Sequence, residues 1–318
     1  MQSDVSTPQV TATVADAPSD NWVDRLAPPA SRPWLRLSRA DRPIGTWLLL
    51  LPCWWGTGLA MMADRPAWVD LWVVVACAIG AVVMRGAGCT WNDITDRDFD
   101  AEVARTRSRP LPSGQVTLRG AFAWLGAQLA VGALILFTMN WAAVLLGIAS
   151  LALVAVYPFA KRFTWWPQVF LGLAFNWGVL VAFAAHGGTL HPAPMLAYAA
   201  GILWTLFYDT IYAHQDAEDD ALIGVKSTAR LFGKDSPRWL LGFAAGAVLL
   251  LAAAVAATRP APLPALIAML GVAGFAAHLW WQLRQFDPDS NPLLLRLFRS
   301  NRDAGLIVAG ALALAGLA

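Results

Sequence analysis

The chain has 318 residues, of which 58% are hydrophobic and 14% charged, and its mean hydropathy is +0.52. Soluble globular domains usually carry about a quarter charged residues, so this composition excludes an ordinary soluble domain. The 17 tryptophans also indicate a membrane, because indole rings favour the membrane–water interface. Cys53, Cys77 and Cys89 lie inside apolar runs without metal-ligand spacing, so we interpret them as buried small hydrophobic residues.

The first 31 residues differ in composition from the rest of the chain. They are rich in Ala, Pro, Ser, Thr and Asp, they lack the apolar core of a signal peptide, and Arg25 is their only basic residue. That balance is wrong for a mitochondrial transit peptide. We therefore predict a disordered cytoplasmic tail over residues 1–31 and one transmembrane domain over residues 32–318.

Apolar stretches long enough to cross a bilayer, which takes about 20 residues, recur along the domain. The pattern predicts an all-α polytopic membrane protein, a bundle of about nine transmembrane helices around a central cavity. Eight spans remain an alternative, because the last stretch is short and the break at 258–263 is tight. The nine candidates cover roughly 44–62, 68–91, 118–138, 141–158, 166–185, 194–212, 238–257, 262–281 and 303–318.

The basic residues indicate the orientation of these spans. With nine spans, only Arg65 and Arg259 of the 23 Lys and Arg fall in loops on the side opposite the amino terminus. Positive charge marks the cytoplasmic side, so the amino terminus is predicted to be cytoplasmic. Arg greatly outnumbers Lys, which is typical of a high-GC bacterial genome, and we therefore expect a multi-pass protein of the bacterial inner membrane.

Two acidic clusters follow apolar spans on that side, NDITDRDFD at 92–100 and YDTIYAHQDAEDD at 208–220. If each cluster continues the preceding helix, at about 100° per residue, most of its acids share one face, whereas Arg97 and Asp98 point away. Like charges at helical spacing repel, so two such stripes indicate a bound cation, and Mg²⁺ prefers carboxylates together with substrate phosphates. The alternative is a pair of solvated helix ends. The two stripes comprise Asn92, Asp93, Asp96 and Asp100, and Asp209, Asp216 and Asp220, with Tyr212 and Asp219 flanking the second.

Basic residues stand near both clusters. Arg85 precedes Asn92 by seven residues, which places it on nearly the same helical face and about 10 Å deeper in the membrane. An arginine inside a span suggests a polar cavity, or an ion pair that neutralises one aspartate. The loop cations suit a diphosphate, although each could be an ordinary loop residue of the positive side. They are Arg105, Arg107, Arg109, Lys161, Arg162, Lys226 and Arg230.

These features together favour an intramembrane, Mg²⁺-dependent enzyme that acts on a polyprenyl diphosphate. The diphosphate would lie at the water boundary and the apolar chain among the helices. Metal ions stabilise a diphosphate leaving group, and an allylic carbocation left behind needs shielding from water.

NDITDRDFD and YDTIYAHQDAEDD resemble the two aspartate motifs of the UbiA superfamily of membrane prenyltransferases, and Tyr157 with Lys161 resembles its YxxxK motif. RPIGTWLLLLPCWWG, RSRPLPSG and GVKSTARLFG are similar to its 4-hydroxybenzoate branch in bacteria, and the resemblance covers about residues 34–318. It implies transfer of a polyprenyl group to the ring carbon ortho to the hydroxyl of 4-hydroxybenzoate, with release of diphosphate, as in ubiquinone biosynthesis. It also implies two Mg²⁺ ions that bridge the diphosphate.

The resemblance further implies roles for individual residues. Asn92, Asp93, Asp96 and Asp100 would hold one Mg²⁺, and Asp209, Asp216 and Asp220 the other. Lys161, Arg162 and Lys226 would bind the diphosphate or line the pocket with Tyr157 and Tyr212. Asp216 is the candidate acceptor of the phenol proton. Arg85 is the first candidate, and Arg162 the second, for binding the acceptor carboxylate. The expected catalytic set is therefore Asp216, Asp96 and Arg85.

Several alternatives remain open from the sequence. Relatives with this fold use dihydroxynaphthoate, homogentisate or protohaem as acceptor. A cation-coupled transporter would also gather ionisable residues, although usually near the bilayer midplane on broken helices. A structural membrane scaffold would show no dependence on Mg²⁺. The expected partners are the two substrates and the lipid bilayer, with no nucleic acid, and nothing in the sequence indicates an oligomeric state.

Overall fold

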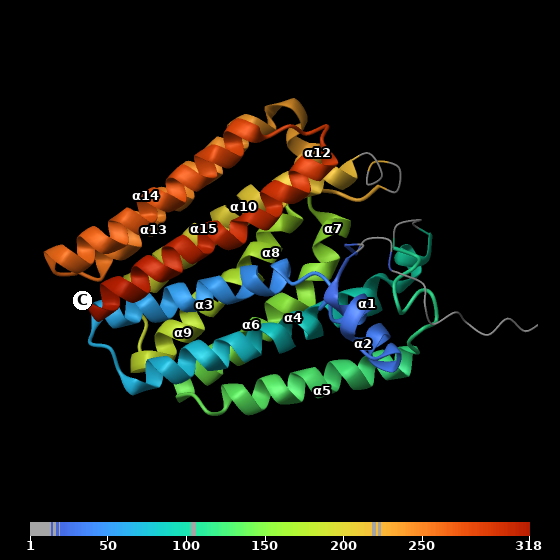
Figure 1. Cartoon of the computed structure of the whole chain (residues 1–318), viewed down its shortest axis with the longest axis horizontal. Helices are drawn as coiled ribbons and strands as arrows, with labels where there is room; N and C mark the ends of the chain where they lie inside the picture. The colour runs from blue at the N-terminus through green and yellow to red at the C-terminus, as the bar shows by residue number, and fades with distance from the viewer. Residues whose placement is uncertain (1–13, 15–16, 19, 103–105, 218–220, 222–223) are drawn as a thin grey trace, which may run out of the picture. The chain divides into compact units, whose positions relative to one another are not determined.

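The computed structural model describes the chain apart from residues 1–13, 15–16, 19, 103–105, 218–220 and 222–223. Every regular element in the described residues is a helix (Figure 1), which confirms the predicted all-α class. The chain divides into two compact units. The first comprises Met1–Thr46 and Val82–Leu134, and the second comprises Trp47–Ala81 and Ile135–Ala318.

Long helices form at all nine predicted stretches, because each is mostly apolar. One predicted span, 166–185, is divided into two helices, and its two halves meet at Trp177, whose indole N–H donates to the Leu146 carbonyl oxygen at 2.8 Å. The long helices are α3 Ile44–Ala63, α4 Trp68–Glu102, α5 Leu118–Leu136, α6 Trp141–Val156, α8 Pro167–Asn176 with α9 Gly178–Gly187, α10 Pro192–Ala213, α13 Ser236–Ala257, α14 Pro262–Gln285 and α15 Asn291–Leu317.

The predicted count of about nine spans is not confirmed. Within the described part of the chain, seven helical segments are long and apolar enough to cross a membrane. Helices α10 and α15 fall short of that criterion. Prolines, tyrosines and Asp209 lower the hydropathy of α10, and the charged first half of α15, with Arg302 and Asp303, lowers that of α15.

In the first unit, short helices precede α3. Helix α1 spans Trp22–Leu26, the turn η1 spans Pro29–Ser31, and α2 spans Arg32–Leu37. Asn21 caps α1, because its side-chain oxygen accepts from the backbone N–H of Asp24 at 3.0 Å. Within the predicted tail, residues Trp22–Leu26 and Pro29–Ser31 are helical. The rest of the tail falls mainly on residues outside those described.

Asp24 ties α1 to α2 through the buried guanidinium of Arg36, whose Nε and Nη2 donate to one Asp24 oxygen at 3.1 and 2.7 Å. Asn21 donates to the other oxygen at 2.7 Å. Burial raises the pKa of Asp24, but the bonds from Arg36 and Asn21 outweigh it, and the pKa lies below its ordinary value of 3.8. The carboxylate is thus stabilised in its charged form.

Asp24→Asn is expected to lower the free energy of unfolding by about 2–3 kcal/mol at neutral pH, because Arg36 loses a charged partner while it stays buried. A carboxyl with a depressed folded-state pKa stabilises the fold above pH ~4 and loses that effect as pH falls through the lower folded value. Thermal unfolding of both proteins in detergent at about pH 7 and pH 3 checks this prediction. A difference that is the same at both pH values would contradict it.

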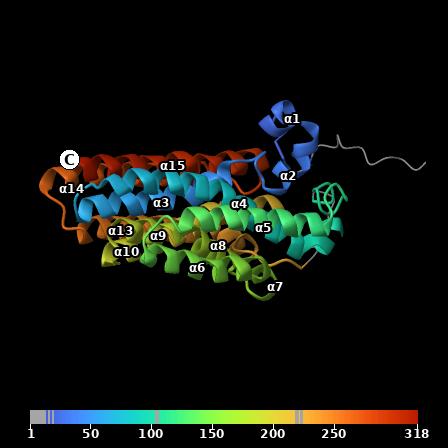
Figure 2. The ribbon, with the colours of Figure 1, turned by 90° about the horizontal axis from the view of Figure 1, so that it is seen from below.

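In the second unit, α10 packs along α13 and α8, and α13, α14 and α15 follow one another up and down (Figures 1 and 2). A buried polar network joins three of these helices. The Trp204 indole N–H donates to the Asn301 side-chain oxygen at 2.8 Å, and the Asn301 amide donates to Gln282 at 3.1 Å. Both amide side chains are fully buried. The network holds α10 against α14 and α15, and α10 carries Asp209.

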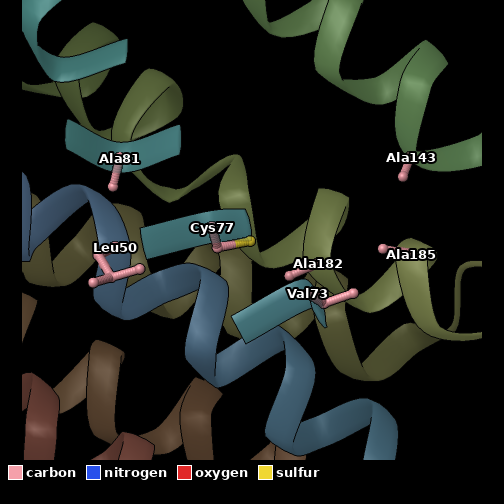
Figure 3. Close-up of a cluster of buried hydrophobic side chains, with 7 residues drawn as sticks. All are labelled: Leu50, Val73, Cys77, Ala81, Ala143, Ala182 and Ala185. Carbon is pink, nitrogen blue, oxygen red and sulfur yellow. The ribbon is translucent and has the colours of Figure 1, made fainter. Parts of the chain in front are cut away.

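A cluster of small and aliphatic side chains joins α3, α4, α6 and α9 in the same unit (Figure 3). Short side chains let helices approach closely, which is how helices associate where water does not drive packing. The approach is close at Gly56 of α3, where an added Cβ would lie 2.3 Å from the Val179 carbonyl oxygen of α9. The cluster consists of Leu50, Val73, Cys77, Ala81, Ala143, Ala182 and Ala185.

Candidate active site

The first acidic cluster lies on the last turns of α4, which continues as a helix to Glu102. This confirms the predicted helical continuation. Asp93, Asp96 and Asp100 are buried, with 0%, 1% and 7% exposure, whereas Arg97 and Asp98 are exposed and pair with each other at 2.9 Å. The predicted separation of Asp98 from the acidic stripe is therefore correct.

Arginines and an amide contact the buried carboxylates. Asn92 donates to Asp96 at 3.2 Å, Arg109 donates to Asp100 at 2.8 Å, and Arg39 donates to Asp93 through Nη1 at 3.0 Å. We predicted Arg109 as a diphosphate cation, and the structure places it on the acidic stripe instead. Sequence reasoning missed Arg39. Nothing in its spacing links it to Asp93, which lies 54 residues away.

Arg85 lies on α4, two turns before Asn92, and is half-buried. Its guanidinium packs against the backbone of Gly45 at the start of α3. A Cβ added at Gly45 would lie 2.5 Å from Nε, 2.6 Å from Nη2 and 2.7 Å from Cζ of Arg85. The stretch RPIGTW thus provides room for this arginine because position 45 has no side chain.

The second acidic cluster departs from the helix we assumed. Helix α10 ends at Ala213, and His214–Asp216 form a 3₁₀ turn, so the angles of a continuous α-helix do not apply to Asp216. Asp209, Tyr212 and Asp216 are half-buried. Asp220 lies outside the described residues.

His214 accounts for the change of helix type. Its Nδ1 lies 2.8 Å from the Thr210 carbonyl oxygen, and its Nε2 lies 3.1 Å from the Ser236 hydroxyl at the start of α13. Because a carbonyl only accepts, Nδ1 carries a proton. Burial lowers the pKa of His214, against a smaller rise from the Thr210 bond, which favours the neutral ring.

The basic stretches YPFAKRF and GVKSTARLFG meet in the second unit. The backbone N–H of Lys226 donates to the Lys161 carbonyl oxygen at 3.4 Å. The Thr228 hydroxyl of α12 (Thr228–Phe232) lies 2.6 Å from the Thr210 hydroxyl of α10. These bonds bring the two predicted lysines beside the helix that carries Asp209.

An aromatic ring that sequence reasoning missed lies among these cations. The Trp165 ring centroid is 5.9 Å from Lys226 Nζ and 5.3 Å from the guanidinium carbon of Arg230. Arg162 is exposed and lies over the Phe159 ring at 5.1 Å. Tyr157 begins the turn η2, Tyr157–Phe159, and is half-buried. The tryptophan of KRFTWW is the signal that could have indicated a cation–π site.

Carboxylate and amide oxygens, the donors that Mg²⁺ prefers, are the groups that α4 and α10 supply. Among the described residues, no three His, Cys, Asp or Glu side chains are grouped closely enough to hold a metal ion. The predicted ligand sets also include the amide of Asn92, and Asp220, which lies outside the described residues. The donor chemistry fits Mg²⁺, and substrate phosphates would complete the coordination.

The sequence pattern of the UbiA prenyltransferase family matches residues 49–302. Together, the helical membrane fold and the acidic helix ends define an intramembrane prenyltransferase. The chain belongs to the UbiA prenyltransferase family.

Curated relatives narrow this class. The mitochondrial 4-hydroxybenzoate polyprenyltransferase of Aedes aegypti is 44% identical over 302 residues, which cover 92% of this chain and 67% of that protein. The protein of the same name from Bos taurus is 46% identical over 286 residues, which cover 89% of this chain and 75% of that protein. The predicted enzyme class, a prenyl-group transferase, is confirmed.

These relatives overturn the predicted location. We expected a bacterial inner membrane, but the matching proteins of Aedes aegypti, Bos taurus and Homo sapiens are named as mitochondrial. The prediction of a bacterial inner membrane is therefore wrong. It rested on the resemblance to the bacterial branch and on the excess of Arg over Lys, which reflects the base composition of a genome and not a compartment.

Solved structures agree on the fold. A UbiA homologue from Aeropyrum pernix K1 matches with a TM-score of 0.66 and 27% identity, covering 85% of this chain and 97% of that chain. A UbiA homologue from Archaeoglobus fulgidus, solved with GPP and Mg²⁺ bound, matches with a TM-score of 0.64 and 20% identity over 87% and 99% of the two chains.

Proposed function

We propose that this chain transfers a polyprenyl group from a polyprenyl diphosphate to the ring carbon ortho to the hydroxyl of 4-hydroxybenzoate. The new bond joins that carbon to the allylic carbon of the donor, diphosphate leaves, and the ring carbon loses its proton. The observation that carries the proposal is the buried carboxylate face of α4, with Asp93, Asp96 and Asp100, in a chain about 45% identical to enzymes of that name.

The proposal assigns metal-binding roles to both acidic clusters. Of the four predicted ligands on α4, Asn92, Asp96 and Asp100 would hold one Mg²⁺, whereas Asp93 is paired with Arg39. Asp209, Asp216 and Asp220 would hold a second Mg²⁺. Bound Mg²⁺ stabilises the charge that develops on the departing diphosphate. Lys161, Arg162 and Lys226 add positive charge for the same group.

Two residues would act on the acceptor. Arg85 would bind its carboxylate, because a half-buried guanidinium two turns before Asn92 is the deepest cation of the first cluster. Asp216 would accept the phenol proton, since a phenolate ring is far more nucleophilic than a phenol. Its half-buried position leaves it accessible to a substrate.

Arg85→Ala is expected to raise KM for 4-hydroxybenzoate about tenfold to a hundredfold, because a charge-assisted hydrogen bond contributes about 1.5–3 kcal/mol. KM for the polyprenyl diphosphate should stay within about threefold, since Arg85 would not contact it. Initial rates with each substrate varied in turn measure both values. An unchanged KM for 4-hydroxybenzoate would show that Arg85 does not bind the carboxylate.

Gly45→Ala is expected to act through Arg85. The added methyl group would overlap the guanidinium, and the flexible arginine side chain would move away from its present position. KM for 4-hydroxybenzoate should rise about threefold to tenfold, with little change in melting temperature. Gly88→Ala, on α4 with no neighbouring atom within 4 Å, is the matched control. Identical KM values in the two variants would contradict the prediction.

Relatives with other acceptors define the second candidate function, prenylation of dihydroxynaphthoate, homogentisate or protohaem. The sequence identity of 44% and 46% to two enzymes named 4-hydroxybenzoate polyprenyltransferase favours 4-hydroxybenzoate as the acceptor. Membranes that contain this chain, offered one polyprenyl diphosphate and each acceptor in turn, separate the candidates. A product from another acceptor formed faster than that from 4-hydroxybenzoate would overturn the proposal.

A further inference from the structure

We propose that Asp93 is the partner of a buried ion pair and not a metal ligand, and that Arg39 is a positioning residue that fixes the metal-binding turn of α4 through this pair. The inference rests on the proposed function, because it divides the first acidic motif into ligands and support. It departs from the simple expectation that every acid of the stripe binds Mg²⁺.

Both oxygens of Asp93 are already engaged. Arg39 Nη1 donates to Oδ2 at 3.0 Å and Nη2 donates to Oδ1 at 2.5 Å, a bidentate pairing, and Arg109 Nη1 lies 3.7 Å from Oδ1. Asp93 has 0% exposure and Arg39 only 6%. A metal ion on Asp93 would have to displace a guanidinium that is almost fully buried, which would leave a buried charge uncompensated.

The backbone of Arg39 is held in an unusual conformation. Its φ is 56°, in the left-handed region that residues other than glycine rarely adopt. Arg39 lies in the turn between α2 and α3, where its N–H and its Nη1 both bond to the Arg36 carbonyl oxygen, at 3.0 and 3.1 Å. Such strain persists where the surroundings over-determine it, and the pair with Asp93 joins the turn to α4.

The pair balances the charge of the stripe. Arg39 and Arg109 provide two positive charges beside Asp93 and Asp100, and Arg109 bridges both acids at 3.7 and 2.8 Å. Carboxylates at successive helical turns repel one another, and two arginines on the same group offset this repulsion. Because Arg39 and Arg109 both bind its acids, α4 keeps a fixed rotation about its axis. This rotation determines the direction of the Asn92 and Asp96 side chains.

The test is a double-mutant cycle of Arg39→Gln and Asp93→Asn, followed by the melting temperature of the full chain in detergent. Without Mg²⁺, each single substitution should lower the melting temperature by about 5–10 °C, because it leaves one buried charge without its bidentate partner. The double variant should recover most of that loss. The exposed pair Arg97 and Asp98, substituted in the same way, is the matched control and should change the melting temperature by about 1 °C or less.

The second readout is the rise in melting temperature that Mg²⁺ with a polyprenyl diphosphate produces. It should persist in the double variant, in which the two neutral amides can still hydrogen-bond to each other and hold the turn, and it should disappear in Asp96→Asn, which removes a proposed ligand. Loss of the Mg²⁺-dependent rise in the double variant would show that Asp93 is a ligand and overturn the inference, as would additive losses in the metal-free cycle. If the wild type shows no Mg²⁺-dependent rise in melting temperature, the proposed metal binding is contradicted. The metal-free double-mutant cycle would still test whether Arg39 and Asp93 form a stabilising ion pair.

Discussion

Asp96→Asn is expected to lower the rate of prenyl transfer by about 10²–10³-fold, whereas Asp98→Asn should keep it within about twofold. Both residues lie on the last turns of α4, and the substitutions are chemically identical. Asp96 is 1% exposed and accepts from Asn92, while the Asp98 side chain is 86% exposed and pairs only with Arg97 among the contacts that are described for it. A metal ligand contributes several kcal/mol to stabilisation of the leaving group, and a solvated surface carboxylate contributes almost nothing.

The comparison requires initial rates at saturating substrates, over a range of Mg²⁺ concentrations. If Asp96 binds the ion, its variant should also need more Mg²⁺ for half-maximal activity, and the Asp98 variant should follow the wild type. Melting temperatures of both variants control for folding. Equal losses in the two variants would mean that the burial pattern of this turn does not separate functional from surface acids.

Gly56→Val is expected to destabilise the fold by at least about 3 kcal/mol and to reduce the yield of folded protein. Its first carbon would lie 2.3 Å from the Val179 carbonyl oxygen and 3.0 Å from two further backbone atoms of α9. Backbone atoms cannot rotate away as a side chain can, so α3 and α9 would have to separate. The neighbouring contact of Gly178 with Cys53, where a Cβ would lie 2.3 Å from the sulfur, makes such a shift harder to absorb.

Gly80→Ala provides the control for Gly56→Val. Gly80 lies in the interior of α4, has no neighbouring heavy atom within 4 Å of an added Cβ, and belongs to the same unit. Alanine favours a helix by up to about 1 kcal/mol over glycine, so this variant should melt at or slightly above the wild-type temperature. Similar melting temperatures for both variants would refute the close approach of α3 and α9.

The sequence predicted the first acidic motif well, because a regular helix converts spacing into direction. Asp93, Asp96 and Asp100 are buried together and Asp98 is exposed, as 100° per residue implies. The assumption of 100° per residue failed after Ala213. There the helix tightens to a 3₁₀ turn around His214, whose partner Ser236 lies 22 residues further along the chain.

Contacts between distant segments were beyond the reach of pattern reasoning. Tertiary packing determines three such contacts. It pairs Arg39 with Asp93, places Gly45 against the Arg85 guanidinium, and brings the Lys226 backbone N–H to the Lys161 carbonyl oxygen. Spacing identifies which residues share a helix face, but it does not say which loop lies opposite. The acids were therefore predictable as a group, and the partner of each acid was not.

The central claim is that this chain joins a polyprenyl group to 4-hydroxybenzoate in a Mg²⁺-dependent reaction. The most direct test extracts the lipid product formed by membranes that contain the chain, with 4-hydroxybenzoate and a polyprenyl diphosphate of known length, and determines its mass with and without Mg²⁺. The account predicts a product with the mass of 4-hydroxybenzoate plus that polyprenyl group minus one hydrogen, formed only when Mg²⁺ is present. The same product at equal yield in the presence of excess chelator, or no product from 4-hydroxybenzoate at all, would contradict it.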